Sequence, residues 1–329
     1  MVGAVLVFEN KIIGEGYHKK YGEAHAEVNC IASVKEVDKH LIEKSTLYVS
    51  LEPCSHFGKT PPCTDLIIKN KIPKVVIGCV DGYKEVDGKG ILRLHDAGVE
   101  VITSVLEKEC IDINKRFFTF HQQQRPYIIL KWAESANGKI GSAHQITSPE
   151  SSPKQRTFIS NEFTNRLVHK WRSEEAAILI GTNTALLDDP SLTTRLWTGN
   201  NPVRLVIDMH LRLPSHSKIF NKEVRTIVFN KQKHADEENL TFYRIEEQNI
   251  LAGILKALYN LQIQSVLVEG GGALLQSFIH EGLWDEAKII TNNTLTIENG
   301  IAAPILNNAV LQKEAVYGND TLKCYNRVK

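Results

Sequence analysis

The pattern of apolar and polar residues along the chain predicts two successive α/β units. In the first third, short runs rich in β-branched and aromatic residues predict strands, and stretches with helical spacing lie between them. The predicted strands span residues 2–7, 11–16, 46–51, 74–79 and 99–104, and the predicted helices span residues 24–34, 64–70 and 90–97. Strands that alternate with helices favour a layered α/β unit with crossover connections.

A second strand-rich region begins at Pro126. Its predicted strands span residues 126–133, 176–181, 203–208, 224–229 and 265–269. Residues 117–124 end in three successive glutamines and look like the connection between the two regions, so we expect domains at residues 1–120 and 121–329. Residues 148–156 hold two prolines and three serines, a composition typical of an exposed insertion.

Composition and charge narrow the class of protein. Hydrophobic residues make up 42% of the 329 residues and charged residues 23%, the balance of a soluble globular protein. A formal charge of +1 offers no electrostatic attraction to nucleic acid or to a membrane surface. No apolar run approaches the roughly 18 residues that span a bilayer, and six scattered cysteines do not suggest a disulfide framework. We therefore expect a cytoplasmic protein with no nucleic-acid or membrane partner.

One constellation carries specific chemistry: His25-Ala26-Glu27, then Pro53-Cys54, then Cys63. One imidazole and two thiolates supply three zinc ligands and leave a fourth position for water, as a catalytic zinc site requires. Glu27 is placed to shuttle that water's protons. This is the pattern of zinc-dependent base deaminases, in which the two cysteines are usually separated by two residues. Here they are nine positions apart.

The alternative to a catalytic site is a closed, structural zinc site. Such a site needs a fourth protein ligand, and only His56 is close in sequence. Glu27 would have no purpose there, so its presence favours catalysis. His56 and Lys59 lie between the two cysteines; they are either solvated loop residues or groups suited to a phosphorylated substrate.

Longer stretches of the chain carry a family resemblance. These are MVGAV, GEGYH, HAE and PCSHFGKTPPC in the first half, and RPYIILKWAESANGKIG, AAILIGTNTALLDDPSLTTR, NPVRLVID and VEGGGALL in the second. Together, and in this order, they resemble the bifunctional riboflavin-biosynthesis deaminase/reductase family over almost the whole chain. The resemblance implies a cytidine-deaminase-like α/β/α domain followed by a dihydrofolate-reductase-like α/β domain.

The resemblance also implies an activity. The first domain would be a zinc-dependent hydrolase that removes the 2-amino group of 2,5-diamino-6-ribosylamino-4(3H)-pyrimidinone 5′-phosphate. It would use His25, Cys54 and Cys63 as zinc ligands and Glu27 as the catalytic proton shuttle, with His56 and Lys59 holding the substrate. The second domain would reduce the ribosyl group to ribityl with NADPH. The enzyme is expected to be a homo-oligomer.

Residue by residue, the resemblance places contacts in the second domain. The implied cofactor contacts are Ala133, Thr184, Asp188, Gly271 and Gly272. The implied substrate contacts are Arg172, Leu192, Arg195 and Glu269, of which the two arginines suit a phosphate. Independently, a strand ending at Glu269 and followed by three glycines and a helical stretch is typical of a phosphate-binding turn. His169 and His210 are interpreted as structural or surface residues.

Two departures from the family pattern matter. The chain begins at the methionine of a usual PNPMVGA stretch, so we expect a truncation that removes a first helix and an asparagine that would contact the pyrimidine. The family's tryptophan soon after GKI is missing, and Phe158 has the best spacing to replace it as the aromatic cofactor contact. Two other functions remain open at this point: a reductase with an inactive deaminase domain, and a nucleotide-binding protein with a structural zinc.

Overall fold

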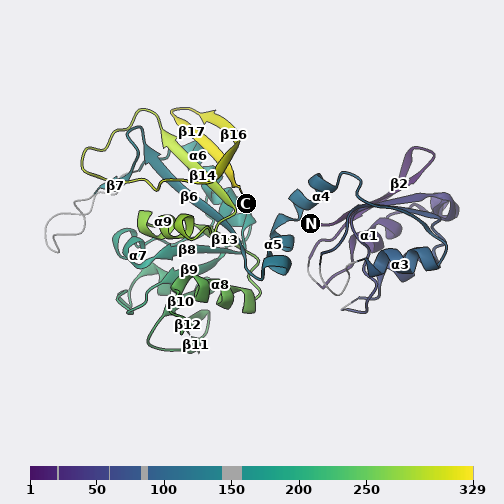
Figure 1. Cartoon of the computed structure of the whole chain (residues 1–329), viewed down its shortest axis with the longest axis horizontal. Helices are drawn as coiled ribbons and strands as arrows, with labels where there is room; N and C mark the ends of the chain where they lie inside the picture. Colours follow the sequence, from purple (N-terminus) through teal and green to yellow (C-terminus); the bar gives the residue numbers. More distant parts are fainter. Residues whose placement is uncertain (21, 59, 83–87, 143–157, 329) are drawn as a thin grey trace. The chain divides into compact units, whose positions relative to one another are not determined.

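The computed structural model describes residues 1–20, 22–58, 60–82, 88–142 and 158–328. It divides into two compact units, Met1–Gln123 and Gln124–Lys329 (Figure 1). The boundary between the units falls within residues 117–124, which were expected to connect the domains. Most of these residues form helix α5, Lys115–Gln123, in which Phe118 and Phe120 are buried. Burial of such apolar side chains stabilises a helix.

The first unit is built on a five-stranded sheet with the order β2-β1-β3-β4-β5. Its strands are β1 (Gly3–Phe8), β2 (Lys11–Tyr17), β3 (Thr46–Leu51), β4 (Lys74–Cys79) and β5 (Glu100–Ile102). β1 is antiparallel to β2 and β3, whereas β3, β4 and β5 are parallel. Parallel neighbours place the loops that follow β3 and β4 at one edge of the sheet, which is where ligands bind in open α/β sheets.

Helices and one 3-10 segment cover this sheet. They are α1 (Ala26–Ala32), η1 (Glu36–Lys44), α2 (Cys63–Lys69), α3 (Lys89–Asp96), α4 (Glu107–Ile113) and α5. One core cluster joins strand residues such as Leu6 and Ile77 to Cys30 of α1 and Ile67 of α2. The helices that carry the motif residues are therefore fixed to the sheet by apolar packing.

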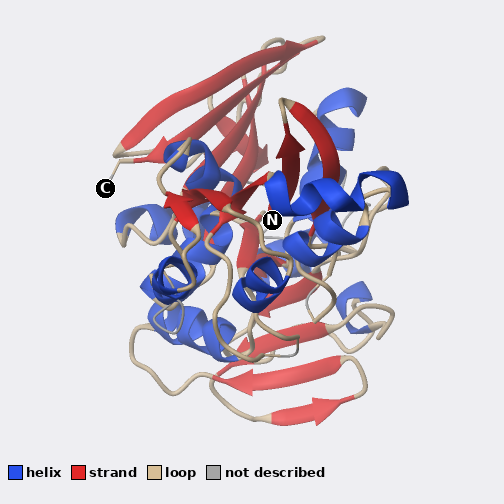
Figure 2. Ribbon diagram, turned by 90° about the vertical axis from the view of Figure 1, so that its right-hand side faces the viewer, coloured by secondary structure: helices blue, strands red, loops and turns tan. Residues whose placement is uncertain are grey.

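The second unit contains a ten-stranded sheet with the order β11-β12-β10-β9-β8-β13-β6-β14-β17-β16. Its strands are β6 (Tyr127–Ser135), β8 (Ala177–Gly181), β9 (Val203–Ile207), β10 (Thr226–Asn230), β11 (Ala235–Glu237), β12 (Leu240–Arg244), β13 (Ser265–Val268), β14 (Glu286–Asn292), β16 (Ala309–Tyr317) and β17 (Asp320–Arg327). The seven strands from β12 to β14 run parallel, and β11, β17 and β16 are antiparallel to their neighbours. The long strands β16 and β17 lie side by side and antiparallel, and Figure 2 shows the C-terminus at the end of a long strand of this sheet. A separate pair is formed by β7 (Lys139–Ser142) and β15 (Gly300–Ala302).

Helices pack on both faces of this sheet. They are α6 (Glu162–Glu174), α7 (Thr182–Asp188), α8 (Ile250–Asn260) and α9 (Gly272–His280), with a short 3-10 segment η3 (Lys218–Phe220). Ile128 and Leu130 of β6 pack with α8 and α9, whereas Ile129 between them packs with Val168 and Trp171 of α6. This alternation is the period of two expected of a strand buried on both faces.

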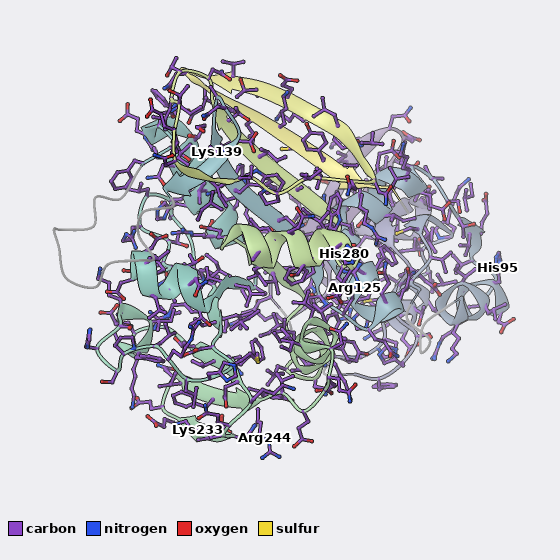
Figure 3. All side chains as sticks on the ribbon, turned by 60° about the vertical axis from the view of Figure 1, so that its left-hand side comes forward. His95, Arg125, Lys139, Lys233, Arg244 and His280 are labelled. Atoms are coloured by element: carbon purple, nitrogen blue, oxygen red, sulfur yellow. The ribbon has the colours of Figure 1, made fainter. Side chains whose placement is uncertain are left out.

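Two basic side chains lie at one edge of the large sheet. Figure 3 shows Lys233 and Arg244 at its β11–β12 end. None of the described helices is long and apolar enough to cross a bilayer.

Candidate active sites

His25, Cys54 and Cys63 come together in the first unit. The Nδ1 atom of His25 lies 3.5 Å from the Sγ atom of Cys54 and 3.3 Å from that of Cys63. A tetrahedral zinc with bonds of about 2.3 Å to sulfur and about 2.0 Å to nitrogen would place such atoms about 3.5 Å apart. The three residues therefore fit a zinc ion in both donor type and spacing.

Each ligand is positioned by the start of a helix or the end of a strand. His25 is in extended backbone conformation immediately before α1, not in the first helical turn as predicted from the sequence. Cys54 follows β3, and Cys63 is the first residue of α2. The N–H of Cys63 donates to the Cys54 Sγ at 3.3 Å, and this bond joins the two ends of the loop between the cysteines.

Among the described residues, the metal-binding cluster contains three ligands and His56 is not one of them. The side chain of His56 is exposed in the loop between the cysteines. Lys59, the other residue of this loop expected to hold substrate, lies outside the described residues. Three protein ligands are the number found in catalytic zinc sites, in which the fourth position takes water or substrate.

Neighbouring groups adjust the protonation of the ligands. Thr60 Oγ1 lies 3.5 Å from the Nε2 atom of His25, and it can accept the Nε2–H of the tautomer that leaves Nδ1 free for a metal. The hydrogen bond between the two cysteines lowers the pKa of the Cys54 thiol and raises that of Cys63. One thiolate is thus favoured even before a metal is considered.

Glu27 lies in the first turn of α1, beside this cluster, and is only 3% exposed. Burial raises the pKa of its carboxyl, and a hydrogen bond with Cys63 partly opposes the rise. A carboxyl whose charged form is disfavoured by burial is suited to pick up and return a proton.

The second unit holds a cleft of about 800 Å³. Its walls come from β6, α6, α7 and the first turn of α9. Nine of the ten residues expected to contact cofactor or substrate in this unit line the cleft: Ala133, Phe158, Arg172, Thr184, Asp188, Arg195, Glu269, Gly271 and Gly272.

Arg172 and Glu269 form a buried ion pair at this cleft. Arg172 donates from Nε to Glu269 Oε1 at 2.8 Å and from Nη2 to Oε2 at 2.6 Å. Burial alone would raise the pKa of Glu269, but the charge of Arg172 and its two hydrogen bonds lower it to about 2. Arg172 and Arg195 are both predicted substrate contacts. The charge of Arg172 is balanced by Glu269, whereas Arg195 has no carboxylate partner among the described ion pairs.

The glycine-rich turn after β13 has the conformation that phosphate binding needs. Gly271 caps α9 with a φ of 51°, a value that favours glycine. A Cβ atom added there would lie 3.2 Å from Thr184 Oγ1. Gly271, Gly272 and Ala273, at the start of α9, line the cleft together with residues of α7. Free N–H groups at a helix start attract anions.

Comparisons with known proteins agree with this geometry in both units. Residues 126–296 match the family profile of the RibD C-terminal domain, and residues 1–79 match that of the cytidine and deoxycytidylate deaminase zinc-binding region. The riboflavin biosynthesis protein RibD of Aquifex aeolicus is 42% identical over 294 residues, which cover 86% of this chain and 78% of that protein.

The chain belongs to the RibD family.

Solved structures extend the likeness of this RibD-family chain over its whole length. A diaminohydroxyphosphoribosylaminopyrimidine deaminase/5-amino-6-(5-phosphoribosylamino)uracil reductase from Thermotoga maritima superposes with a TM-score of 0.85 at 31% identity, covering 99% of this chain and 91% of that one. RibD of Acinetobacter baumannii gives the same TM-score at 28% identity, covering 100% of this chain and 92% of that one. The predicted fold class, a cytidine-deaminase-like domain followed by a reductase domain, is confirmed. Matches in both domains do not favour the two alternative functions.

One predicted contact of the RibD pattern lies elsewhere. The side chain of Leu192 is 2% exposed and packs in a cluster with Ile178, Ile180 and Val206. It is the one predicted reductase residue that does not line the cleft. Phe158 does line the cleft and exposes 76% of its surface, whereas the expected insertion at residues 148–156 lies outside the described residues.

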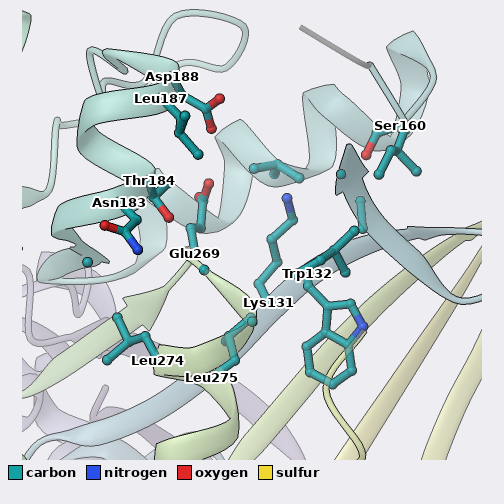
Figure 4. A pocket seen from close by; sticks show the side chains of 18 of the residues that line it. Lys131, Trp132, Ser160, Asn183, Thr184, Leu187, Asp188, Glu269, Leu274 and Leu275 are labelled. Atoms are coloured by element: carbon teal, nitrogen blue, oxygen red, sulfur yellow. The ribbon is translucent and has the colours of Figure 1, made fainter. Parts of the chain in front are cut away.

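Sequence reasoning missed Lys131. Figure 4 shows Lys131 and Glu269 pointing into the cleft, while Trp132 points away from Lys131, as successive residues of a strand do. The charge of Lys131 contributes to the low pKa of Glu269. The available signal was a single lysine inside an otherwise apolar strand, because a charged residue in such a strand is costly unless it serves a site.

Glu52 was also missed, although it directly precedes Pro53-Cys54. Its buried carboxylate, 4% exposed, accepts four backbone N–H groups at 2.9–3.3 Å, donated by Asp81, Gly88, Gly90 and Ile91. These bonds hold the start of α3 against the segment Glu52-Pro53-Cys54, which carries one of the zinc ligands. Gly90 permits the contact, because a Cβ there would lie 2.1 Å from the carbonyl oxygen of Pro53.

Proposed function

We propose that the chain catalyses two successive steps of riboflavin biosynthesis. The first unit hydrolytically deaminates 2,5-diamino-6-ribosylamino-4(3H)-pyrimidinone 5′-phosphate with Zn²⁺, and the second reduces the ribosyl group of the product to ribityl with NADPH. The observation that carries the proposal is the presence, on one RibD-family chain, of a three-ligand zinc cluster beside a buried glutamate and of a cleft that unites anion-binding groups.

In the deaminase unit, His25, Cys54 and Cys63 would hold the metal. Bound zinc lowers the pKa of a coordinated water towards neutrality. Glu27 would take up a proton from the attacking water and return protons to the ring nitrogen and to the departing ammonia. His56 and Lys59 hold the phosphorylated substrate from the loop between the cysteines.

In the reductase unit, NADPH supplies a hydride when bound. The cofactor would contact residues that line the cleft, Ala133, Phe158, Thr184, Asp188, Gly271 and Gly272, and the N–H groups at the start of α9 would receive its phosphates. Arg195 binds the substrate phosphate, and the backbone of Leu192 supports the same segment.

The Arg172–Glu269 ion pair keeps Glu269 from acting as a proton donor in this cleft. Because Arg172 holds the pKa of Glu269 near 2, Glu269 stays ionised and accepts hydrogen bonds from the ribosyl hydroxyls. Reduction forms a C–H bond at C1′ and breaks its bond to the ring oxygen, which needs a proton. Lys131 is the cationic group of the cleft that can donate this proton.

The proposal is tested by following both products on the phosphorylated diaminopyrimidinone, with zinc quantified. We expect about one zinc per chain, then ammonia release, then NADPH oxidation. A Glu27→Gln variant is the matched control: it should keep zinc, lose ammonia release, and still oxidise NADPH on deaminated substrate. Zinc binding with neither activity would contradict the proposal and support a binding protein. NADPH oxidation on deaminated substrate alone would support a reductase with an inactive deaminase.

We also propose a homo-oligomer. β16 is an edge strand of the large sheet, and Val310, Leu311 and Val316 on it are exposed. Exposed edges with apolar side chains pair readily with other strands. Sedimentation analysis of the protein should show more than one chain per particle, and a monomer at micromolar concentration would contradict this.

A further inference from the structure

We propose that His169 is a positioning residue of the reductase cleft, which together with Arg172 holds the backbone of Thr193–Arg195 so that the Arg195 guanidinium meets the substrate phosphate. The inference rests on the proposed function, and it adds a residue that acts through the backbone of the arginine proposed to bind the phosphate.

Helix α6 contacts the segment after α7 at two points. The Nδ1 atom of His169 accepts the backbone N–H of Arg195 at 2.9 Å. One turn further along, Arg172 Nη1 donates to the carbonyl oxygen of Thr193 at 3.2 Å. Residues three apart lie on the same face of a helix. One face of α6 therefore forms hydrogen bonds with both an N–H and a C=O of the segment Thr193–Arg195.

These two hydrogen bonds fix the backbone next to the Arg195 side chain, which is proposed to bind the phosphate. The Arg195 side chain is exposed at the cleft, and its Nη1 donates to Thr193 Oγ1 at 2.8 Å. Thr193 and Arg195 are the two residues whose main chain α6 holds. The exposed Arg195 side chain takes part in none of the described ion pairs. The location of its guanidinium therefore follows the position of this backbone.

His169 is suited to this role because it stays uncharged. Only a ring without a proton on Nδ1 can accept the Arg195 N–H. Burial, then the charges of Arg172 and Arg195, and more weakly Lys131, lower the pKa of His169 to about 4, against an opposing effect of Glu269. The ring is therefore a neutral acceptor across the pH range in which enzymes of this kind are assayed.

Packing alone does not require a histidine here. His169 is 3% exposed, and its neighbour on the helix, Val168, fills the apolar core instead. A buried imidazole without a partner would cost free energy that an aliphatic side chain avoids. The hydrogen bond to Arg195, and not packing, is therefore the interaction that requires a histidine at position 169.

The test compares His169→Asn with His169→Leu. The Oδ1 atom of Asn lies close to where the Nδ1 atom of His lies and keeps the acceptor, whereas Leu has similar bulk and none. We expect His169→Leu to raise the KM for the deaminated, phosphorylated substrate about tenfold or more, since the partly buried backbone N–H of Arg195 loses its acceptor. His169→Asn should stay within about threefold of the wild type. The KM for NADPH and the rate of ammonia release should not change in either variant.

A substrate without its phosphate provides the deciding control. The wild type and both variants should reduce it with equal kcat/KM, because Arg195 has nothing to bind. Equal damage by Asn and Leu would overturn the proposal, as would a loss with His169→Leu that is the same with and without the phosphate. If the Leu variant does not fold, His169→Gln replaces it, since its acceptor reaches the Nε2 position rather than Nδ1.

A failure of the proposed function would be recognised separately. If the wild type oxidises no NADPH, the reductase assignment is wrong, and the role of His169 is then decided by calorimetric binding of ribose 5-phosphate. The wild type and His169→Asn should bind this probe alike and His169→Leu about tenfold more weakly. Equal binding by all three proteins would overturn the positioning role.

Discussion

Glu27 and Glu269 are both almost completely buried, yet their surroundings prepare them for opposite tasks. Glu27 lies beside thiols and an imidazole, and burial raises the pKa of its carboxyl. Glu269 is held by Arg172, whose charge and two hydrogen bonds lower its pKa to about 2 in spite of burial. The same side chain thus becomes a group that exchanges protons in one unit and a fixed anion in the other.

The two sites also differ in how the chain assembles them. The zinc cluster uses two short segments, residues 25–27 and 52–64, each tied to the start of a helix. The reductase cleft draws on β6, α6, α7, the stretch that contains Arg195, and the start of α9. A compact motif can be recognised from spacing, whereas a cleft of distant segments depends on the sheet that brings them together.

The largest expected effect tests the proton exchange assigned to Glu27. Glu27→Gln keeps the shape of the side chain but cannot take up a proton, so ammonia release should fall about 10²–10⁴-fold. Zinc content and NADPH oxidation on deaminated substrate serve as controls and should remain at wild-type levels. An unchanged rate of ammonia release would remove the functional contrast between the two glutamates.

The next effect concerns the ion pair. Glu269→Gln leaves the Arg172 guanidinium buried without a counter-charge, and breaking such a pair costs about 3–5 kcal/mol of stability. Denaturant unfolding of the second unit should report this loss. The double variant Arg172→Met/Glu269→Leu should recover much of the stability, although it lacks reductase activity. A Glu269→Gln variant as stable as the wild type would show that the Arg172 guanidinium needs no carboxylate to remain buried.

A smaller effect is expected at Glu52. Glu52→Gln replaces one acceptor oxygen by an amide that points hydrogens at backbone N–H groups, which should cost about 1–3 kcal/mol in the first unit. Ammonia release should fall with it, because the bonded segment includes Asp81 and the start of α3. NADPH oxidation should be unaffected. If the thermal transition of the first unit does not move, the four N–H groups find other acceptors.

The smallest effect is a pH dependence carried by His169. Its pKa is about 4 in the folded chain, below the usual value of 6.5. Between these values the unfolded state binds more protons, so stability rises as pH increases from about 4 to about 6.5. Asn does not titrate, so the melting temperature of His169→Asn should rise less steeply over this range. Parallel curves for the two proteins would mean that His169 titrates normally.

The sequence by itself determined most of the secondary structure and the zinc-ligand set. Strands β3 and β4 lie at residues 46–51 and 74–79, as the apolar runs predict. Helix α9 begins at the predicted glycine turn. His25, Cys54 and Cys63 come together as proposed from residue type and spacing. These features depend on short-range patterns, since the period of apolar residues and a few helix and turn signals are local properties of the chain.

Only the tertiary structure decided which groups meet. Arg172 and Glu269 are 97 positions apart, and no local pattern shows that they bind each other rather than a ligand. The same holds for His169 and Arg195, for the four N–H groups around Glu52, and for the burial of Leu192. The glutamine-rich stretch became helix α5 because its phenylalanines found a core. Charge pairing and burial are energies of contact between distant segments, and those contacts exist only once the sheets have formed.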